Sequence, residues 1–461
     1  MKLKILHIAL LTSILLMGGC KKFVEVGPPS NQIASETIFL SEGTATAAIN
    51  GLYNTMSNTS LSFAGGGQTV YLGLYADEIY TTSTTANVLE FVDGKLSSSN
   101  SIVYNNFWRY AYQVIYQSNS CIAGLEKSPL APDFKQQLLG EAYFVRAYCY
   151  WQLVNLFGDI PLVLTADDYA SVVQMKRSPI AEVRAQVLTD LAQAKIMLKP
   201  EYPTTGRFRV NYYTVMAMIS RVQTYIGNWT EVLASSNEVI SQSSYSLESD
   251  LNKVFLIGST EAIWQTGSGN PTYGSYEGFA FVPATSATIR PVYPLQASLY
   301  NAFSSTDKRK INWIAVKTIA GVTYQYPYKY KIRLNASTTT PKTECQMMVR
   351  LGEIYLNRAE AKAHLGDPTA IDDLNKIRNR AGLISLSGLT GQALIDAILK
   401  ERRLELFAEW GLRWLDLKRT GQLDQVIGPL KNTWTSTASL FPIPTSEILA
   451  APNLTQNPGY N

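Results

Sequence analysis

The pattern of hydrophobic and polar residues predicts that this chain folds mainly into α-helices. Residues 138–157 are apolar almost all round, which is typical of an inner helix that packs on several sides. Two further stretches repeat apolar residues at the 3.6-residue spacing of a one-sided helix. The first contains Met347, Leu351, Ile354, Ala361 and Leu365, and the second contains Ile395, Ile398, Leu399 and Leu406.

A recurring arrangement joins neighbouring helices: a glycine ends one helix, and an Asn or Asp precedes the next. It occurs at Gly227-Asn228 and at Gly366-Asp367-Pro368. Glycine adopts the left-handed conformation after a helix, the polar side chain caps the following helix, and proline fits its first turn. Each unit spans roughly 34 residues, as in tetratricopeptide repeats. We therefore predict a mainly α, tetratricopeptide-like scaffold of stacked hairpins with long irregular loops and little β-structure.

Two loop-rich segments, about 57–100 and 267–342, interrupt the helical pattern. They are rich in Ser, Thr, Gly, Asn and Pro and carry scattered aromatic residues. Loops of this length in a compact chain usually carry function. An aromatic ring in a polar loop offers a flat apolar face on which a sugar ring stacks, while neighbouring polar side chains bond the sugar hydroxyls. The candidate ligand-binding residues are Tyr80, Tyr273, Tyr276, Tyr293 and Trp313.

The N-terminal region predicts export and attachment to a membrane. Residues 1–19 combine a short basic start, an apolar run and two small residues, as in a secretory signal peptide. Cys20 follows directly, which resembles the lipobox of bacterial lipoproteins, where the cysteine is acylated. Two or more acyl chains hold a protein durably at a bilayer. We predict a lipid anchor and tether at 20–30 and one domain at 31–461; the alternative is an ordinary signal peptide with a chance cysteine.

Composition narrows the possible chemistry. The formal net charge is +4, so nothing indicates electrostatic binding to nucleic acid. His364 is the one histidine beyond the predicted signal peptide, which excludes a histidine-rich metal site and a histidine relay. We expect no cofactor other than the covalent lipid at Cys20. The remaining cysteines, Cys121, Cys149 and Cys345, allow at most one intramolecular disulfide.

Several polar or aromatic residues have both a structural and a functional interpretation. The charged residues at 401–416 favour a structural or helix-packing role over acid–base catalysis, because Arg402 and Glu405, or Glu409 and Arg413, stand at the spacing of ion pairs along one helix. Asp77 and Glu78 favour an anchor for a loop over a ligand contact or a catalytic carboxylate. Trp108, among other aromatic residues, favours packing over a sugar platform. For His364 a satisfied or solvent-facing position is favoured over ligand binding.

Seven short motifs occur in order along the chain. They are EAYFVRA (141–147), LFGDIPL (156–162), RLGEIYLNRAEA (350–361), ERRLEL (401–406), GLRWLDL (411–417), FPIP (441–444) and QNPGY (456–460). Together with Cys20, this order resembles the SusD/RagB family of Bacteroidota outer-membrane lipoproteins. The resemblance covers nearly the whole chain after residue 19, and the combination is specific although each motif alone is weak.

The resemblance implies an α-helical protein without catalytic activity, anchored by lipid in the outer membrane and facing outward from the cell. Such proteins act as lids on SusC-type TonB-dependent transporters, capture glycans and hand them to the transporter. Some branches of the family capture peptides, so capture of peptides or protein fragments is the alternative function. An extracytoplasmic hydrolase using two carboxylates and a purely structural adaptor are the other possibilities that the residues leave open.

Overall fold

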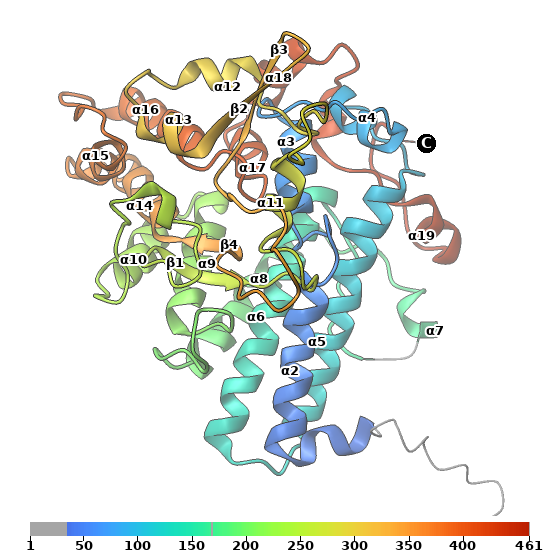
Figure 1. Cartoon of the computed structure of the whole chain (residues 1–461). Coiled ribbons are helices and arrows are strands. Elements are labelled where there is room, and N and C mark those ends of the chain that lie inside the picture. Colours follow the sequence, from blue (N-terminus) through green and yellow to red (C-terminus); the bar gives the residue numbers. More distant parts are fainter. Residues whose placement is uncertain (1–34, 167–168, 461) are drawn as a thin grey trace, which may run out of the picture.

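A computed structural model describes residues 35–166 and 169–460 (Figure 1). The predicted signal peptide, Cys20 and the tether lie outside the described residues. The described part is mainly α-helical, as predicted. Its long helices are α2 (Glu42–Ser57), α5 (Tyr110–Glu126), α6 (Pro132–Phe157), α8 (Ile180–Met197), α9 (Tyr212–Ile226), α10 (Trp229–Ile240), α14 (Leu351–His364), α15 (Ala370–Arg380), α16 (Gly391–Glu405) and α17 (Leu412–Arg419).

Shorter elements complete the described chain. The short α-helices are α3 (Gly73–Tyr75), α4 (Ala86–Asp93), α7 (Tyr169–Val172), α11 (Tyr276–Phe281), α12 (Ala297–Ala302), α13 (Lys308–Trp313), α18 (Leu423–Ile427) and α19 (Thr445–Ala450). The π-helices are η3 (Gln68–Leu72) and η4 (Val103–Arg109), and the 3₁₀-helices are η2 (Ser35–Leu40), η5 (Leu251–Lys253), η6 (Gly428–Leu430) and η7 (Ser436–Ser439). The strands are β1 (Ala262–Thr266), β2 (Ile314–Ile319), β3 (Val322–Pro327) and β4 (Gln346–Arg350).

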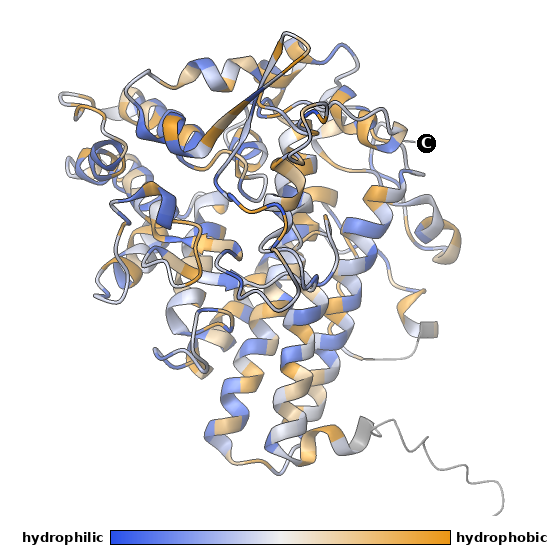
Figure 2. Cartoon of the chain, in the orientation of Figure 1, coloured by the Kyte–Doolittle hydropathy of each residue, from blue (hydrophilic) through white to orange (hydrophobic). Residues whose placement is uncertain are grey.

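Helix α6 is the predicted inner helix. Pro132 stands in its first turn, where its missing N–H costs no hydrogen bond. From Leu138 to Phe157, all residues except Tyr143 are buried. Helices α5 and α8 pack directly on α6, which explains why its sequence has no polar face. Along α2 and α5, in contrast, hydrophobic and hydrophilic residues alternate around the helix (Figure 2).

The first predicted hairpin joins α9 and α10. Gly227 follows α9 with φ 84°, a conformation that favours glycine, and Asn228 precedes Trp229, the first residue of α10. The Asn228 side chain makes no capping hydrogen bond, so this part of the prediction is wrong. The amphipathic faces of these two helices pack on each other, and α10 packs on α14 of the next hairpin. The stacked hairpins therefore form the scaffold that the sequence predicts.

The second hairpin joins α14 and α15 and begins later than its sequence predicts. Gly366 has φ 75°, but α15 starts at Ala370, so Pro368 lies in the connection and not in the first helical turn. The reason is Asp367, whose carboxylate accepts hydrogen bonds from the backbone N–H and the hydroxyl of Thr369, both at 2.8 Å. This local turn occupies the residues that a direct helix start would need.

The strands form two antiparallel pairs, β1 with β4 and β2 with β3. Met347 pairs with Gln265 and thus lies in a strand, and not in the helix that the spacing predicts, because α14 begins only at Leu351. Strands β2 and β3 are joined by Ala320 and Gly321, with φ 51° and 81°. Positive φ at both turn residues is the geometry of a tight type I′ hairpin.

The segment at 57–100 is not the irregular surface loop that its composition predicts. Residues 62–79 are all buried, and η3 and α3 lie within them. Aromatic packing with the distant C-terminal region explains the difference. The Tyr75 ring lies 4.7 Å from the ring of Trp414 and 5.5 Å from that of Phe441, measured between centroids. The segment therefore runs through the core.

The segment at 267–342 keeps long irregular stretches between α11, α12, α13 and the β2–β3 hairpin. It is the yellow-to-orange part that crosses the front and top of Figure 1. Buried ion pairs fix it to the helices. Arg350 pairs with Glu405 at 2.6 Å and with Glu409 at 2.8 Å, Arg309 pairs with Glu405 at 3.1 Å, and Lys329 pairs with Glu409 at 2.5 Å. We call these five residues the Arg350 network.

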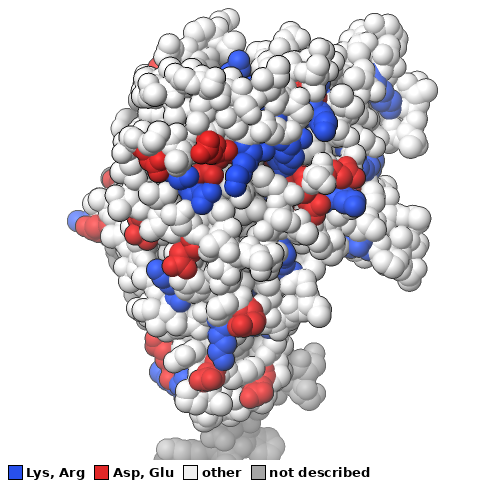
Figure 3. Space-filling view, turned by 90° about the vertical axis from the view of Figure 1, so that its left-hand side faces the viewer, with Lys and Arg blue, Asp and Glu red and all other residues white. Residues whose placement is uncertain are grey.

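The Arg350 network confirms the structural role of the charged residues at 401–416, but the partners differ from those that the spacing predicts. Among the described residues, Arg402 pairs with Asp416 and not with Glu405, and Arg413 pairs with Asp77 and not with Glu409. On the face shown in Figure 3, acidic and basic side chains lie interspersed among many uncharged residues. Cys121, Cys149 and Cys345 are free and buried. Within residues 35–166 and 169–460, no helix is long and apolar enough to cross a membrane.

Candidate functional site

Trp313 does not offer a face to a ligand, which corrects its assignment as a sugar-binding residue. It ends α13, its side chain is 0% exposed, and its indole Nε1 donates a hydrogen bond to the carbonyl oxygen of Leu251 at 2.9 Å. Lys329 Nζ lies 4.7 Å from its ring centroid, so the ring packs beside the Arg350 network. The charged residues of α13 make its sequence look like a polar loop, but the tryptophan belongs to the core.

Tyr276 and Tyr293 are also buried, with 1% and 7% of their surface exposed, and this corrects their assignment as well. Tyr276 opens α11, where the Ser275 hydroxyl accepts a hydrogen bond from the backbone N–H of Gly278 at 2.9 Å. Tyr293 packs against Phe281, with ring centroids 6.3 Å apart. Polar neighbours in sequence do not reveal which side of the chain a ring occupies, because the backbone places adjacent side chains on different faces.

Tyr273 is half-buried and forms an aromatic stack at the molecular surface. Its ring lies parallel to that of Phe279, with centroids 4.1 Å apart and an interplanar angle of 14°, and meets the edge of Tyr276 at 5.8 Å. The Arg333 guanidinium lies 4.4 Å from the Phe279 centroid and donates hydrogen bonds to the backbone oxygens of Phe279 and Val282. We call Tyr273, Phe279 and Arg333 the Tyr273 platform.

Polar groups lie in the loops next to the Tyr273 platform. The backbone N–H of Asn335 donates to the carbonyl oxygen of Thr272 at 2.7 Å, which brings its side chain beside the residue before Tyr273. Within the described residues, Asn335 Nδ2 has no hydrogen-bond partner. Lys342 Nζ donates to the backbone oxygens of Ser268 and Asn270 and to the Ser268 hydroxyl, so its three N–H groups are filled, and burial lowers its pKa. The Tyr273 ring therefore lies among polar loops whose positions are fixed by hydrogen bonds, and its flat face is the feature on which a sugar ring stacks.

Tyr80 is half-buried and pairs with the segment that follows Tyr293. Its backbone N–H donates to the carbonyl oxygen of Pro294 at 2.9 Å, next to a bridge between Ile79 and Leu295. Burial raises the pKa of its hydroxyl, and the nearby Tyr324 raises it further. The part of the chain that the structure describes shows no ring contact between Tyr80 and the Tyr273 platform.

Sequence reasoning finds Tyr273 but misses the polar residues beside it. Arg333, Asn335 and Lys342 lie far from Tyr273 along the chain, in a segment where polar residues are common, so no spacing marks them. Phe279 carries a detectable signal, because it is an aromatic residue in the same loop-rich segment. Only the folded chain shows that these residues meet.

Asp77 is an anchor, in agreement with the favoured interpretation. Its carboxylate pairs with Arg403 at 2.6 Å and with Arg413 at 2.9 Å, and is 5% exposed. Burial acts to raise the pKa of Asp77, but the two arginines outweigh it and hold the pKa below its usual value. Glu78 Oε2 accepts a hydrogen bond from the backbone N–H of Ala408, while burial raises the pKa of Glu78 to about 7. The pair therefore ties 77–78 to the C-terminal helices.

His364 and Trp108 also have structural surroundings. The His364 ring stacks on Trp229 with centroids 4.0 Å apart and an interplanar angle of 5°, and burial lowers its pKa. Trp108 is 2% exposed and meets the edge of Phe157 at 5.0 Å. Within the described residues, no group of three or more His, Cys, Asp or Glu side chains is placed to hold a metal ion.

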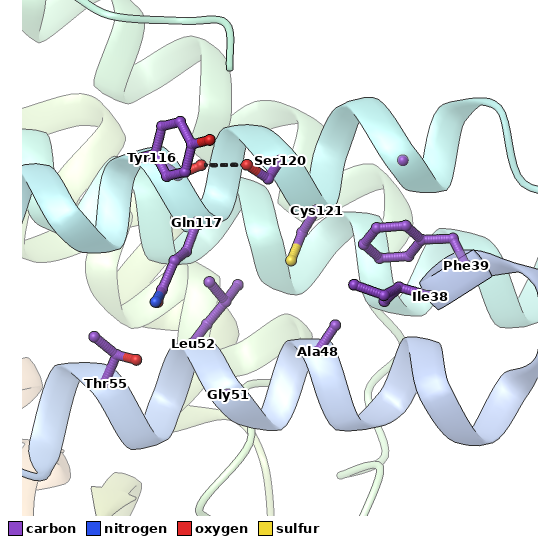
Figure 4. A pocket seen from close by; sticks show the side chains of 11 residues that line it. Ile38, Phe39, Ala48, Gly51, Leu52, Thr55, Tyr116, Gln117, Ser120 and Cys121 are labelled. Carbon is purple, nitrogen blue, oxygen red and sulfur yellow. Dashed lines mark hydrogen bonds between the residues drawn. The ribbon is translucent and has the colours of Figure 1, made fainter. Parts of the chain in front are cut away.

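A groove of about 430 Å³ lies between α2 and α5, beside η2 (Figure 4). Its lining includes Phe39, Ala48, Leu52 and Cys121, and the Ser120 hydroxyl in it donates to the carbonyl oxygen of Tyr116 at 2.9 Å. Because this hydroxyl already has a backbone partner and most of the lining is apolar, the groove lacks the converging polar groups of a sugar site. The Tyr273 platform is therefore the better candidate site.

Two family models match the chain. The SusD family model matches residues 259–460, and a model described as "Starch-binding associating with outer membrane" matches residues 22–224. The chain belongs to the SusD family, whose members are binding proteins associated with the outer membrane.

Individual relatives share the whole length of the chain. A SusD-like protein of Formosa agariphila is 26% identical over 96% of both chains. The crystal structure of a SusD superfamily protein from Bacteroides vulgatus has a TM-score of 0.81 at 21% identity and covers 92% of this chain and 100% of its own. A laminarin-binding SusD-like protein has a TM-score of 0.76 at 22% identity and covers 91% and 99%. The two structures confirm the mainly α fold.

Proposed function

We propose that this chain is a lipid-anchored glycan-binding protein of the outer membrane without catalytic activity. In this proposal it captures an oligosaccharide or polysaccharide and delivers it to a SusC-type TonB-dependent transporter. Membership of the SusD family supports glycan binding, and one structural neighbour is described as binding laminarin. The anchor is Cys20, and the protein faces outward from the cell.

The observation that carries the proposal is the Tyr273 platform. Tyr273 stacks on Phe279 at 4.1 Å, so the orientation of its ring is fixed before any ligand arrives. The Tyr273 hydroxyl contributes a polar end to an otherwise apolar face. Asn335 Nδ2, which is buried beside the platform, has no partner in the described chain. A preorganised ring favours binding, because little conformational entropy is lost.

Calorimetry and affinity electrophoresis against a panel of polysaccharides and oligosaccharides test the proposal. We expect at least one glycan to bind, and Tyr273→Ala to weaken that binding about tenfold, which corresponds to about 1.4 kcal/mol. Tyr116→Ala is the matched control, because Tyr116 is an exposed tyrosine on α5 that lines the groove of Figure 4. An equal loss of glycan affinity in both variants would show that the Tyr273 platform is not part of the binding site. Binding to peptides alone would establish the alternative function.

The anchor and the transporter need separate tests. Cys20→Ala should release the protein from the outer membrane, and full retention there would show that acylation of Cys20 is not the anchor. Purification of the membrane complex should recover a TonB-dependent transporter with the chain bound as its lid. Recovery of the chain without such a transporter would contradict the delivery step.

A further inference from the structure

A small cationic pocket lies where α6, α8, α9 and α17 meet, and it shares no lining residue with the Tyr273 platform. Its volume is about 190 Å³. The residues that line it are Asn155, Arg184, Tyr225, Leu415, Lys418 and Arg419. We call it the α17 pocket.

Two of the three cations in the α17 pocket have no carboxylate partner. Arg419 is neutralised, since its guanidinium pairs with Glu360 at 2.6 Å and with Asp416 at 2.8 Å. Arg184 and Lys418, in contrast, form no ion pair with any described residue. Lys418 Nζ donates to the carbonyl oxygen of Asn155 at 2.5 Å, which leaves its charge uncompensated.

The same two cations repel each other. Burial and, to a smaller extent, the charge of Arg184 together lower the pKa of Lys418 to about 7. Burial also lowers the pKa of Arg184, and no anionic group acts against this change. Two half-buried cations beside each other are unfavourable in the empty pocket, and an anion between them reverses the sign of the interaction.

The α17 pocket also contains polar atoms without partners. The Tyr225 hydroxyl, on a side chain that is 8% exposed, makes no hydrogen bond within the described chain, and neither does Arg184 Nε. The Tyr225 ring is held in place by the Arg419 guanidinium, which lies 5.4 Å from its centroid. Buried polar groups in folded proteins nearly always have partners. Both side chains line the α17 pocket, so an acceptor bound there would lie beside two donors that have no partner in the described chain.

We propose that the α17 pocket binds an oxyanion, a carboxylate, sulfate or phosphate group, through Arg184, Lys418 and the Tyr225 hydroxyl. The guanidinium presents parallel N–H donors to two oxygens of such a group, the ammonium adds a point charge, and the phenol donates one hydrogen bond. The volume accommodates the anionic group together with a few waters or part of an attached sugar. This site does not depend on glycan binding at the Tyr273 platform.

Thermal unfolding and calorimetry with inorganic sulfate, inorganic phosphate and glucuronate test the proposal, each against chloride at equal ionic strength. We expect a saturable rise in the unfolding temperature with at least one oxyanion. General salt effects also stabilise proteins, but they do not saturate in this way. Arg184→Gln combined with Lys418→Gln should weaken binding at least tenfold, while Lys400→Gln, which changes an exposed lysine on α16, should bind as the wild type does.

The variants also separate ligand binding from a structural role. Without added anion, the double variant should unfold at the same temperature as the wild type or higher, because it lacks the repulsion between the two cations. Lys418→Arg should retain binding, because the positive charge stays. If a sulfated sugar or glucuronate binds more tightly than the inorganic ions, the oxyanion that the α17 pocket takes belongs to a glycan. If the inorganic ions bind more tightly, the pocket takes a free anion. Equal responses of wild type and double variant to all three anions would refute the site.

Discussion

The pH dependence of stability at Glu277 tests the packing beneath the Tyr273 platform. This side chain is 2% exposed, Thr69 donates a hydrogen bond to its Oε1 at the long distance of 3.5 Å, and its Oε2 has no partner in the described chain. Burial and, to a smaller extent, the nearby Glu409 together raise the pKa of Glu277 from 4.5 to about 7. The folded protein therefore keeps this carboxyl protonated at pH values where the unfolded chain has released the proton.

The magnitude follows from the two pKa values. Because the folded-state pKa is raised, the contribution of Glu277 to stability is fully present below pH 4.5 and is lost as pH rises through about 7. At 1.36 kcal/mol per pKa unit, the free energy of unfolding falls by about 3 kcal/mol over this window. Glu277→Gln keeps the size of the side chain and stays neutral. Relative to the wild type, it should therefore gain about 3 kcal/mol between about pH 4 and about pH 8.

Urea unfolding followed by tryptophan fluorescence measures this difference at each pH. Comparison of the two proteins at the same pH cancels the titration of all other groups. Glu201→Gln is the control, because Glu201 is exposed, and its difference from the wild type should stay constant across the range. A constant difference for Glu277→Gln as well would show that this carboxyl is ionised in the folded protein and would refute the burial argument.

Three further changes test other parts of the structure by the same urea measurement. Glu78→Gln should gain stability relative to the wild type between about pH 4 and about pH 8, because burial raises the pKa of Glu78 to about 7; a pH-independent difference would contradict this. Asp77→Asn should cost about 3 kcal/mol by leaving Arg403 and Arg413 without their carboxylate, and an unchanged midpoint would show that the anchor is dispensable. Trp313→Ala should lower the free energy of unfolding by about 3–5 kcal/mol, while the folded fraction still binds glycan. A variant that is as stable as the wild type but no longer binds glycan would show that Trp313 does contact the ligand.

The sequence predicts those parts of the fold whose causes are local. Helix α6 follows from its mostly apolar surface between Leu138 and Phe157, and the α9–α10 hairpin follows from Gly227 and its neighbours. The burial of residues 62–79 depends instead on rings that lie far away along the chain, such as Trp414 beside Tyr75. No local pattern encodes such contacts, so a composition rich in small polar residues gives the wrong prediction.

The same distinction between local and distant causes explains which residues of the candidate site the sequence predicts. Aromatic residues in polar segments are easy to identify, and Tyr273 is among those predicted. Whether a ring faces outward depends on helix starts and on core contacts, which place Tyr276 and Trp313 inside. The polar residues Asn335 and Lys342 carry no distinguishing pattern, and only the folded chain brings them to the platform.

The position of the Tyr273 platform depends on how the loop that carries its polar residues is closed. Glu344, which is 1% exposed, accepts hydrogen bonds from the backbone N–H groups of Lys331 and Ile332 at 2.7 and 3.1 Å, so it closes the base of the loop at 333–343. Strand β4 follows directly and ends at Arg350, in the buried network. Because the base is fixed, ligand binding has to order only the loop tip, which lowers its entropic cost. Substitutions within 333–343 can therefore alter ligand preference without disturbing the Arg350 network.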